Sequence, residues 1–202
     1  MKKTAYISLI LFIFASCSVI MKKVVLGIKK PKIENEASIS KYLQKYDLDI
    51  SDAFILSDSL YIAMITENTK YFSKYEVYNS ELEKIIPKDT LTNQCYGNIK
   101  LILQEVDDTS LWVNDTVQGK AHALQRNSLK LNGTTSSKQI FSDQAYYVVF
   151  YWAKFMGSYT KSLLDIASGL EQQNKPNVEV ITINMDKNVT MTDSIQELKF
   201  NF

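Results

Sequence analysis

The chain has 202 residues, of which 46% are apolar and 22% are charged, and its formal charge at pH 7 is +1. This composition is typical of a globular protein, and the length fits one domain with a small appendage. The near-neutral charge argues against nucleic acid as a partner, because phosphate backbones are bound by a concentrated basic face. One histidine and two cysteines cannot build a metal cluster, so we expect neither a metal nor another cofactor.

Residues 1–16 have the features of a secretory signal peptide. Lys2 and Lys3 precede an apolar stretch from Ala5 to Ala15, and small residues lead into Cys17. The segment resembles a bacterial lipoprotein signal, in which such a cysteine is lipidated and becomes the new N-terminus. Phe14 departs from the Leu that this pattern prefers three residues before the cysteine. The resemblance implies a protein held in the bacterial cell envelope by a lipid on Cys17.

An uncleaved membrane anchor is the alternative interpretation of the same segment. Apolar character extends from Ala5 to Met21, which is at the short limit for crossing a bilayer. Both interpretations tether the protein to a membrane outside the cytosol. Residues 17–36 then form a basic, membrane-proximal tether, whose lysines either strengthen the attachment to lipid or are solvated along a flexible linker.

Residues 37–202 are expected to form a single α/β domain. In chain order we predict a helix over 37–46, a strand over 53–57, a hairpin with strands at 74–78 and 82–86, and a helix over 94–106. Residues 59–66 fit a helix or a strand equally well, because a short apolar run does not separate the two by periodicity. Residues 107–143 are rich in Gly, Ser, Thr and Asn and are interpreted as a long irregular connection with some helix.

The pattern is clearest after residue 145. Residues 146–153 form the continuous apolar run of a strand that is buried on both faces. Ser158 is the predicted N-cap of a helix over 159–172, and residues 178–184 alternate like a second strand. A strand-helix-strand unit of this size predicts parallel strands and a right-handed crossover. The final segment, IQELKFNF, is read as a strand or a frayed tail.

Residues 148–186 resemble the thioredoxin family. The resemblance rests on the segment VVFYWAKFMGSYTK, whose Tyr-Trp-Ala stands where the family has Phe-Trp-Ala, and on VEVITINMD, which is similar to the family's second strand. The family's redox loop is Cys-x-x-Cys at the helix start. Here those two places hold Met156 and Tyr159, and neither a thioether nor a phenol can replace a thiolate. The family's cis-proline has no counterpart at a matching place either.

The order of the elements differs from the family as well. In the family, a hairpin and a helix follow the strand-helix-strand unit, whereas here too few residues remain after Asp186 and a hairpin comes earlier. We therefore hypothesise a thioredoxin-like sheet assembled in permuted order. This hypothesis requires the hairpin at 75–86 to lie in the same sheet as residues 147–152.

Three functions fit these observations. The first is a redox-inactive, membrane-anchored module that binds or scaffolds an unidentified protein partner through the loop Lys154, Phe155, Met156, Gly157, Ser158 and Tyr159. The second is a thiol enzyme that uses Cys95 as a single reactive cysteine. The third is an enzyme with carboxylates at Asp107, Asp108 or Asp186, although these come with no base, metal ligands or phosphate loop. The sequence favours the first, because no catalytic constellation is present.

Overall fold

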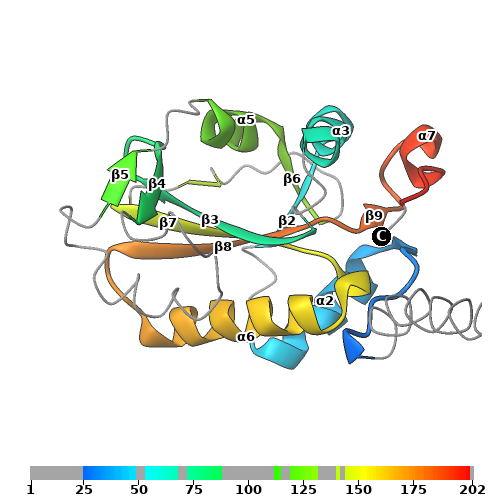
Figure 1. Ribbon diagram of the computed structural model, residues 1–202, viewed down its shortest axis with the longest axis horizontal. Coiled ribbons are helices and arrows are strands. Elements are labelled where there is room, and N and C mark those ends of the chain that lie inside the picture. Colours follow the sequence, from blue (N-terminus) through cyan, green and yellow to red (C-terminus); the bar gives the residue numbers. More distant parts are fainter. Residues whose placement is uncertain are drawn as a thin grey trace, which may run out of the picture.

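The computed structural model of the chain describes residues 25–48, 53–67, 72–87, 112–114, 119–131, 140–141 and 144–200. It has an α/β architecture, in which one seven-stranded mixed sheet carries helices on both faces (Figure 1). The strands of this sheet are β2 (Ala53–Leu56), β3 (Ser73–Asn79), β4 (Lys84–Pro87), β5 (Trp112–Asn114), β6 (Ser128–Lys130), β7 (Tyr146–Trp152) and β8 (Val178–Asn184). The helices are α2 (Glu36–Leu43), α3 (Asp58–Glu67), α5 (Lys120–Asn127), α6 (Ser158–Gln173) and α7 (Asp193–Gln196), with short 3-10 turns η2 (Gln44–Tyr46) and η7 (Lys154–Met156).

The order of the strands in the sheet is β5-β4-β3-β7-β8-β2-β6. β7 and β8 are parallel along their full lengths, and β2 pairs with the far edge of β8, also in parallel. On the other side, β3 runs antiparallel to β7 from Ser73 opposite Trp152 to Asn79 opposite Tyr146. The predicted hairpin, β3 and β4, therefore lies in the same sheet as β7, as the permuted hypothesis requires.

The continuous apolar run of β7 is explained by the two helical layers. Successive side chains of a strand point to opposite faces. Val148, Phe150 and Trp152 belong to the core beneath α2 and α6, whereas Tyr147, Val149 and Tyr151 belong to the core beneath α3 and α5. Figure 1 shows these two helix pairs on opposite faces of the sheet. Because helices cover both faces of the sheet, no side chain of β7 has to be polar for contact with water, and the strand is apolar throughout.

Most predicted elements are present near their predicted bounds. The helix over 37–46 corresponds to α2 with η2, the strand over 53–57 to β2, and the hairpin to β3 and β4. Residues 59–66 are helical, within α3, which buries Tyr61 and Met64 one turn apart against the sheet. The strand-helix-strand unit at the end of the chain is formed by β7, α6 and β8. The helix predicted over 94–106 lies outside the described residues.

The described parts of 107–143, interpreted from the sequence as a long irregular connection with some helix, contain the helix α5 and two short strands. Residues 120–130 form α5 followed directly by β6, which pairs antiparallel with β2 at one edge of the sheet. β5 lies at the opposite edge, against β4. β5 and β6 each have three residues, and α5 buries only Ala121 and Leu124, so the sequence carries little periodicity to reveal them.

The two ends of the described chain meet beside the main sheet. β1 (Ile33–Glu34) pairs in parallel with β9 (Lys187–Asn188), which follows β8 almost immediately. The described part of the final segment, residues 195–200, forms no strand, which was one of the two interpretations open from the sequence. Its first two residues end the short helix α7, and Phe200 packs edge-on against Phe72 with ring centroids 5.1 Å apart.

Candidate functional site

The turn that joins β7 to α6 is at the centre of the candidate site. β7 ends at Trp152, whose side chain is fully buried and stacks on Tyr42 of α2 at a centroid distance of 5.6 Å. The chain then makes the 3-10 turn η7, and Gly157 precedes α6. Thr160 in the first turn of α6 donates a hydrogen bond of 2.5 Å to the carbonyl of Ala153, which fixes the helix against the strand end.

Some residues of the predicted contact loop 154–159 lie in the core, and others lie at the surface. Phe155 is 4% exposed and packs edge-on against Phe72 at a centroid distance of 5.1 Å, so it is a core residue. Met156 and Tyr159 are half-buried, and Ser158 is exposed. Ser158 is not the N-cap that the sequence predicts. It is the first residue of α6, and its amide and hydroxyl both donate to the carbonyl of Leu26, at 2.8 and 3.1 Å.

Residues 25–32, here called the strap, lie across this loop. The amide of Lys29 donates to the carbonyl of Phe155 at 2.8 Å, and Leu26 accepts from Ser158 as described above. Gly157 lies directly beneath the strap. A Cβ atom on Gly157 would be 2.2 Å from the carbonyl oxygen of Leu26, and its φ of +60° favours glycine. The second half of the basic tether predicted from the sequence is thus packed on the domain.

Lys154 connects three segments that are distant in the sequence. Its ammonium group donates to Glu34 Oε2 at 2.6 Å and to Ser38 Oγ at 2.6 Å, which ties the β7 end to β1 and α2. Its backbone amide donates to Asp186 Oδ2 at 2.8 Å, just after the end of β8. Asn184 Nδ2 donates to the same oxygen at 2.9 Å. The carboxyl ends of both central parallel strands therefore meet at Lys154.

Asp186 is 1% exposed, and burial raises the pKa of its carboxyl group from 3.8 to about 6. The negative charge of Glu34 acts in the same direction. The two hydrogen bonds from Lys154 and Asn184, together with the charge of Lys154, lower the pKa and so oppose it. Near neutral pH the group is mostly ionised, and it takes up a proton on mild acidification.

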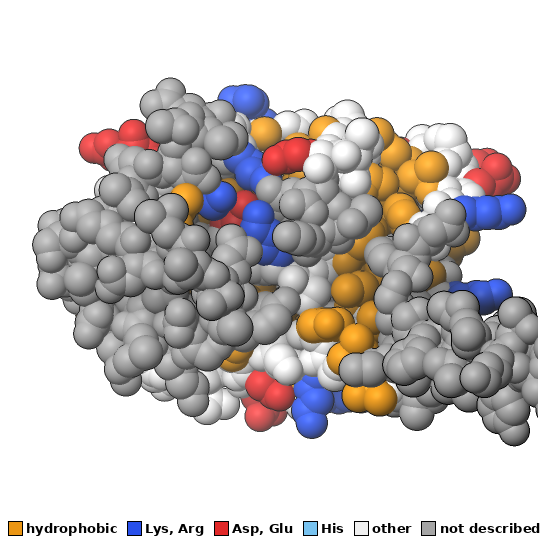
Figure 2. Space-filling view, in the orientation of Figure 1, with side chains coloured by type: hydrophobic (Ala, Val, Ile, Leu, Met, Phe, Trp, Pro, Cys, Tyr) orange, Lys and Arg blue, Asp and Glu red, His pale blue; other side chains and the backbone are white. Residues whose placement is uncertain are grey.

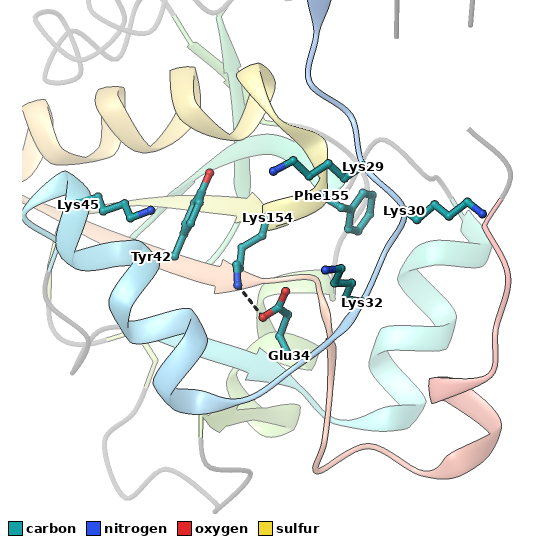
Figure 3. A pocket seen from close by; sticks show the side chains of 8 residues that line it. All are labelled: Lys29, Lys30, Lys32, Glu34, Tyr42, Lys45, Lys154 and Phe155. Carbon is teal, nitrogen blue, oxygen red and sulfur yellow. Dashed lines mark hydrogen bonds and ion pairs between the residues drawn. The ribbon is translucent and has the colours of Figure 1, made fainter. Parts of the chain in front are cut away.

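A pocket of about 290 Å³ opens beside Lys154 (Figure 3). Five of its lining residues are lysines, from the strap, α2's extension η2 and the β7 end: Lys29, Lys30, Lys32, Lys45 and Lys154. Glu34 is the carboxylate in the lining, and the rings of Tyr42 and Phe155 complete it. Ligands of parallel α/β sheets bind beyond the carboxyl ends of the strands, which is where this pocket lies.

The ring of Tyr42 forms the wall between the core and the pocket. The ammonium groups of Lys45 and Lys154 lie 5.5 and 5.9 Å from its centroid, within the range of cation–π contacts. Burial, the hydrogen bond from the hydroxyl of Tyr46 and nearby negative charge raise the pKa of Tyr42 well above 10. The phenol therefore stays neutral and can donate a hydrogen bond at physiological pH.

A second charged cluster lies on the other face of the sheet, around Glu76 of β3. Its carboxylate is 1% exposed and lies 2.9 Å from the ammonium group of Lys74, 3.6 Å from Lys84 and 3.5 Å from Lys120. Tyr78 and Tyr151 also donate hydrogen bonds to it, at 2.8 and 3.1 Å. Burial lowers the pKa of Lys120 to about 8. Figure 2 shows acidic and basic side chains together on the part of this face that lies over β3 and β4.

Of the other residues singled out in the sequence, Cys17, Cys95, Asp107 and Asp108 lie outside the described residues. His122 is exposed on α5. Within the described ranges, no three His, Cys, Asp or Glu side chains are grouped so that they could hold a metal ion.

The sequence interpretation missed the pocket because its parts are far apart in the chain. Glu34 and Lys154 are separated by 120 positions, and Lys45 belongs to a third segment. Lysines are concentrated at 22–32 in the sequence, but this pattern predicts only a basic tether. No pattern of spacing indicates that Lys29 and Lys32 face a cavity beside α6.

No family model, curated protein or solved structure matches this chain. In the part of the chain that the structure describes, no helix combines the length and apolar character needed to cross a bilayer. The site must therefore be interpreted from its own geometry. That geometry is a turn without a thiol at the carboxyl ends of β7 and β8, covered by the strap and bordered by a basic pocket.

Proposed function

We propose that the protein is a bacterial envelope lipoprotein, anchored by a lipid on Cys17, whose thioredoxin-like domain binds a partner and carries out no thiol chemistry. The observation that carries the proposal is the β7–α6 turn. It follows Trp152-Ala153 at the end of a central strand, and it has Met156 and Tyr159 where the thioredoxin family has its two cysteines. A thiolate nucleophile cannot form at either place.

The topology of the sheet supports the thioredoxin-like part of the proposal. β7 and β8 are parallel neighbours joined by α6, and an antiparallel hairpin lies on the other side of β7 in the order β4-β3-β7-β8. The hairpin precedes this unit in the chain instead of following it. The domain is therefore proposed to be a permuted member of that fold.

The proposed binding surface includes the basic pocket as well as the loop. Phe155 is in the core and Gly157 is covered by the strap, so the loop offers a partner chiefly Ser158 and the accessible parts of Met156 and Tyr159. The pocket next to it offers ammonium groups and the aromatic ring of Tyr42. Such a surface favours a partner with anionic groups.

Restoring the two cysteines tests the fold assignment. In a Cys95→Ala background, the variant Met156→Cys/Tyr159→Cys is expected to form an intramolecular disulfide, seen as the loss of two hydrogens by mass spectrometry. The control Met156→Cys/Lys161→Cys, whose second thiol is further along the exposed side of α6, is expected to stay reduced. A dithiol that remains reduced in the first variant would contradict a thioredoxin-like turn.

Metabolic labelling with a palmitate analogue in a bacterial host tests the anchor. The wild-type chain and Cys95→Ala are expected to be labelled and to fractionate with membranes, and Cys17→Ala is expected to lose the label. Equal labelling of Cys17→Ala and the wild type would contradict lipidation at Cys17. Membrane association of an unlabelled protein that keeps Met1 would instead support the uncleaved anchor.

A further inference from the structure

The pocket beside Lys154 has a strong local excess of positive charge in a chain whose formal charge is only +1. Five lysines line it, and the nearby carboxylates are Glu34, Asp165 and Asp186. Glu34 is engaged by the ammonium group of Lys154 at 2.6 Å. Asp186 accepts its hydrogen bonds from Lys154 N–H and Asn184 from inside the protein. Neither of these carboxylates forms an ion pair with Lys29, Lys32 or Lys45.

Lysines in this pocket differ in where they point. In Figure 3, the ammonium groups of Lys29, Lys32 and Lys45 are turned toward the space around Tyr42 and Lys154, whereas Lys30 points away from it. Within the described part of the chain, Lys29, Lys32 and Lys45 have no carboxylate within ion-pair distance. Ammonium groups that converge on one space and form no ion pair of their own are arranged to bind an anion. The neutral phenol of Tyr42 adds a further hydrogen-bond donor at the same place.

The chemistry of the groups favours phosphate. Lysine binds phosphate as a mobile point charge, and each ammonium group can donate to a different phosphate oxygen. The volume of about 290 Å³ exceeds that of a phosphate and leaves space for the glycerol-sized group attached to it. The half-buried ring of Tyr42 provides apolar surface for that attached part.

The position of the strap indicates where such a phosphate would come from. Lys29 and Lys32 follow Cys17 closely in the sequence, and an extended chain covers about 3.5 Å per residue. With Cys17 in the bilayer, the pocket is held within roughly 50 Å of the head groups even if the intervening chain is fully extended. Anionic lipids attract basic segments next to an anchor, with a contribution of about 1 kcal/mol for each lysine.

We propose that this pocket binds the phosphate group of an anionic phospholipid in the membrane that holds the chain. This inference rests on the proposed lipid anchor, and it goes further by assigning a ligand to the pocket. Binding would fix the orientation of the domain on the membrane, with the carboxyl ends of β7 and β8 toward the head groups.

Lysine footprinting of the full acylated protein tests the proposal. The protein is placed in vesicles of phosphatidylcholine, with or without about one third phosphatidylglycerol, and each lysine's rate of acetylation is measured by mass spectrometry. With phosphatidylglycerol, we expect acetylation of Lys29, Lys32 and Lys45 to slow about fivefold, the factor that corresponds to one lysine–lipid contact. Lys41 and Lys161, exposed on α2 and α6, are expected to change little.

Matched variants separate the pocket from general electrostatic attraction. Lys32→Gln is expected to remove most of the protection at Lys29 and Lys45, whereas Lys30→Gln, which removes the same charge from a side chain that points away, leaves it unchanged. Equal effects of the two variants, or equal protection of Lys41 and Lys161, would overturn the assignment of a defined site. The absence of protection at Lys29, Lys32 and Lys45 in vesicles with phosphatidylglycerol would overturn it as well.

A further experiment with a soluble phosphate ester distinguishes a lipid phosphate from a free one. Glycerol 3-phosphate is added to the protein in vesicles of phosphatidylcholine alone, at concentrations up to millimolar. If it protects the pocket lysines as well as phosphatidylglycerol does, the pocket binds a soluble phosphate ester and the lipid assignment is overturned. Because palmitate labelling of Cys17 is measured separately, loss of protection in a labelled protein refutes the pocket proposal without refuting the anchor.

Discussion

At the residue scale, Asp186 shows how a hydrogen-bonded carboxylate can still oppose folding. Both Lys154 N–H and Asn184 Nδ2 donate to one oxygen, Oδ2, while the whole side chain is removed from water. Desolvation outweighs these bonds, and the pKa rises from 3.8 to about 6. The folded state therefore binds the proton more tightly than the unfolded state between these two pH values.

Asp186→Asn should change this pH dependence in a defined direction. An amide oxygen in the place of Oδ2 can accept both hydrogen bonds without carrying charge. The wild type loses stability relative to the variant as the pH rises from about 4 to about 6, and the difference reaches at most about 3 kcal/mol and is constant above that. Urea unfolding of both proteins at several pH values measures it. A difference that shrinks with rising pH would contradict the raised pKa.

For Glu76 we expect the opposite effect of the negative charge on stability, because three lysine ammonium groups surround its carboxylate. Glu76→Gln leaves Lys74, Lys84 and Lys120 next to one another without the carboxylate between them. We expect a loss of unfolding free energy of about 3 kcal/mol, as for other broken buried ion pairs. Glu81→Gln, in the exposed turn between β3 and β4, removes the same charge and should change stability by less than about 0.5 kcal/mol. Equal effects in urea unfolding would show that the Glu76 cluster does not contribute.

At the element scale, the strap is held mainly by backbone contacts, and Gly157 allows them. A methyl group at Gly157 would collide with the carbonyl oxygens of Leu26 and Gly27 at 2.2 and 2.5 Å, with a φ of +60°. Gly157→Ala is therefore expected to cost about 1–3 kcal/mol and to release the strap. In hydrogen exchange, the amide of Lys29, bonded to the carbonyl of Phe155, should lose its protection.

Gly169→Ala is the matched control for this change. Gly169 lies in the middle of α6 with open space around its Cβ position, so alanine should raise stability by about 0.5–1 kcal/mol. The amide of Lys29 should keep its protection in this variant. If Gly157→Ala left the exchange of Lys29 as slow as Gly169→Ala does, the strap would not depend on the close approach at Gly157.

The elements that could be predicted from sequence are those with enough length for a period to show. β7, α6 and β8 have 7, 16 and 7 residues, and their apolar positions repeat with the expected spacing. β6, with only Ser128, Leu129 and Lys130, has none, and its place at the sheet edge is set by pairing with β2. The basic pocket could not be predicted either, because contacts between Glu34, Tyr42 and Lys154 depend on the tertiary fold.

At the scale of the whole molecule, several features of the described part of the chain converge on the candidate site. The carboxyl ends of the two central parallel strands, the start of α6, the strap and the basic pocket all meet around Lys154. In the proposed lipoprotein the strap also leads to the membrane anchor, so this edge of the sheet would face the bilayer. We propose that binding at this site replaces the thiol chemistry to which a thioredoxin-like turn is suited.

The most direct test of that claim is the reduction of insulin disulfides by dithiothreitol, with and without the purified protein. We expect insulin to precipitate at the same rate in both cases, because Met156 and Tyr159 cannot form or exchange a disulfide. Acceleration by the wild type that disappears in Cys95→Ala would contradict the claim and establish instead a thiol enzyme that uses Cys95.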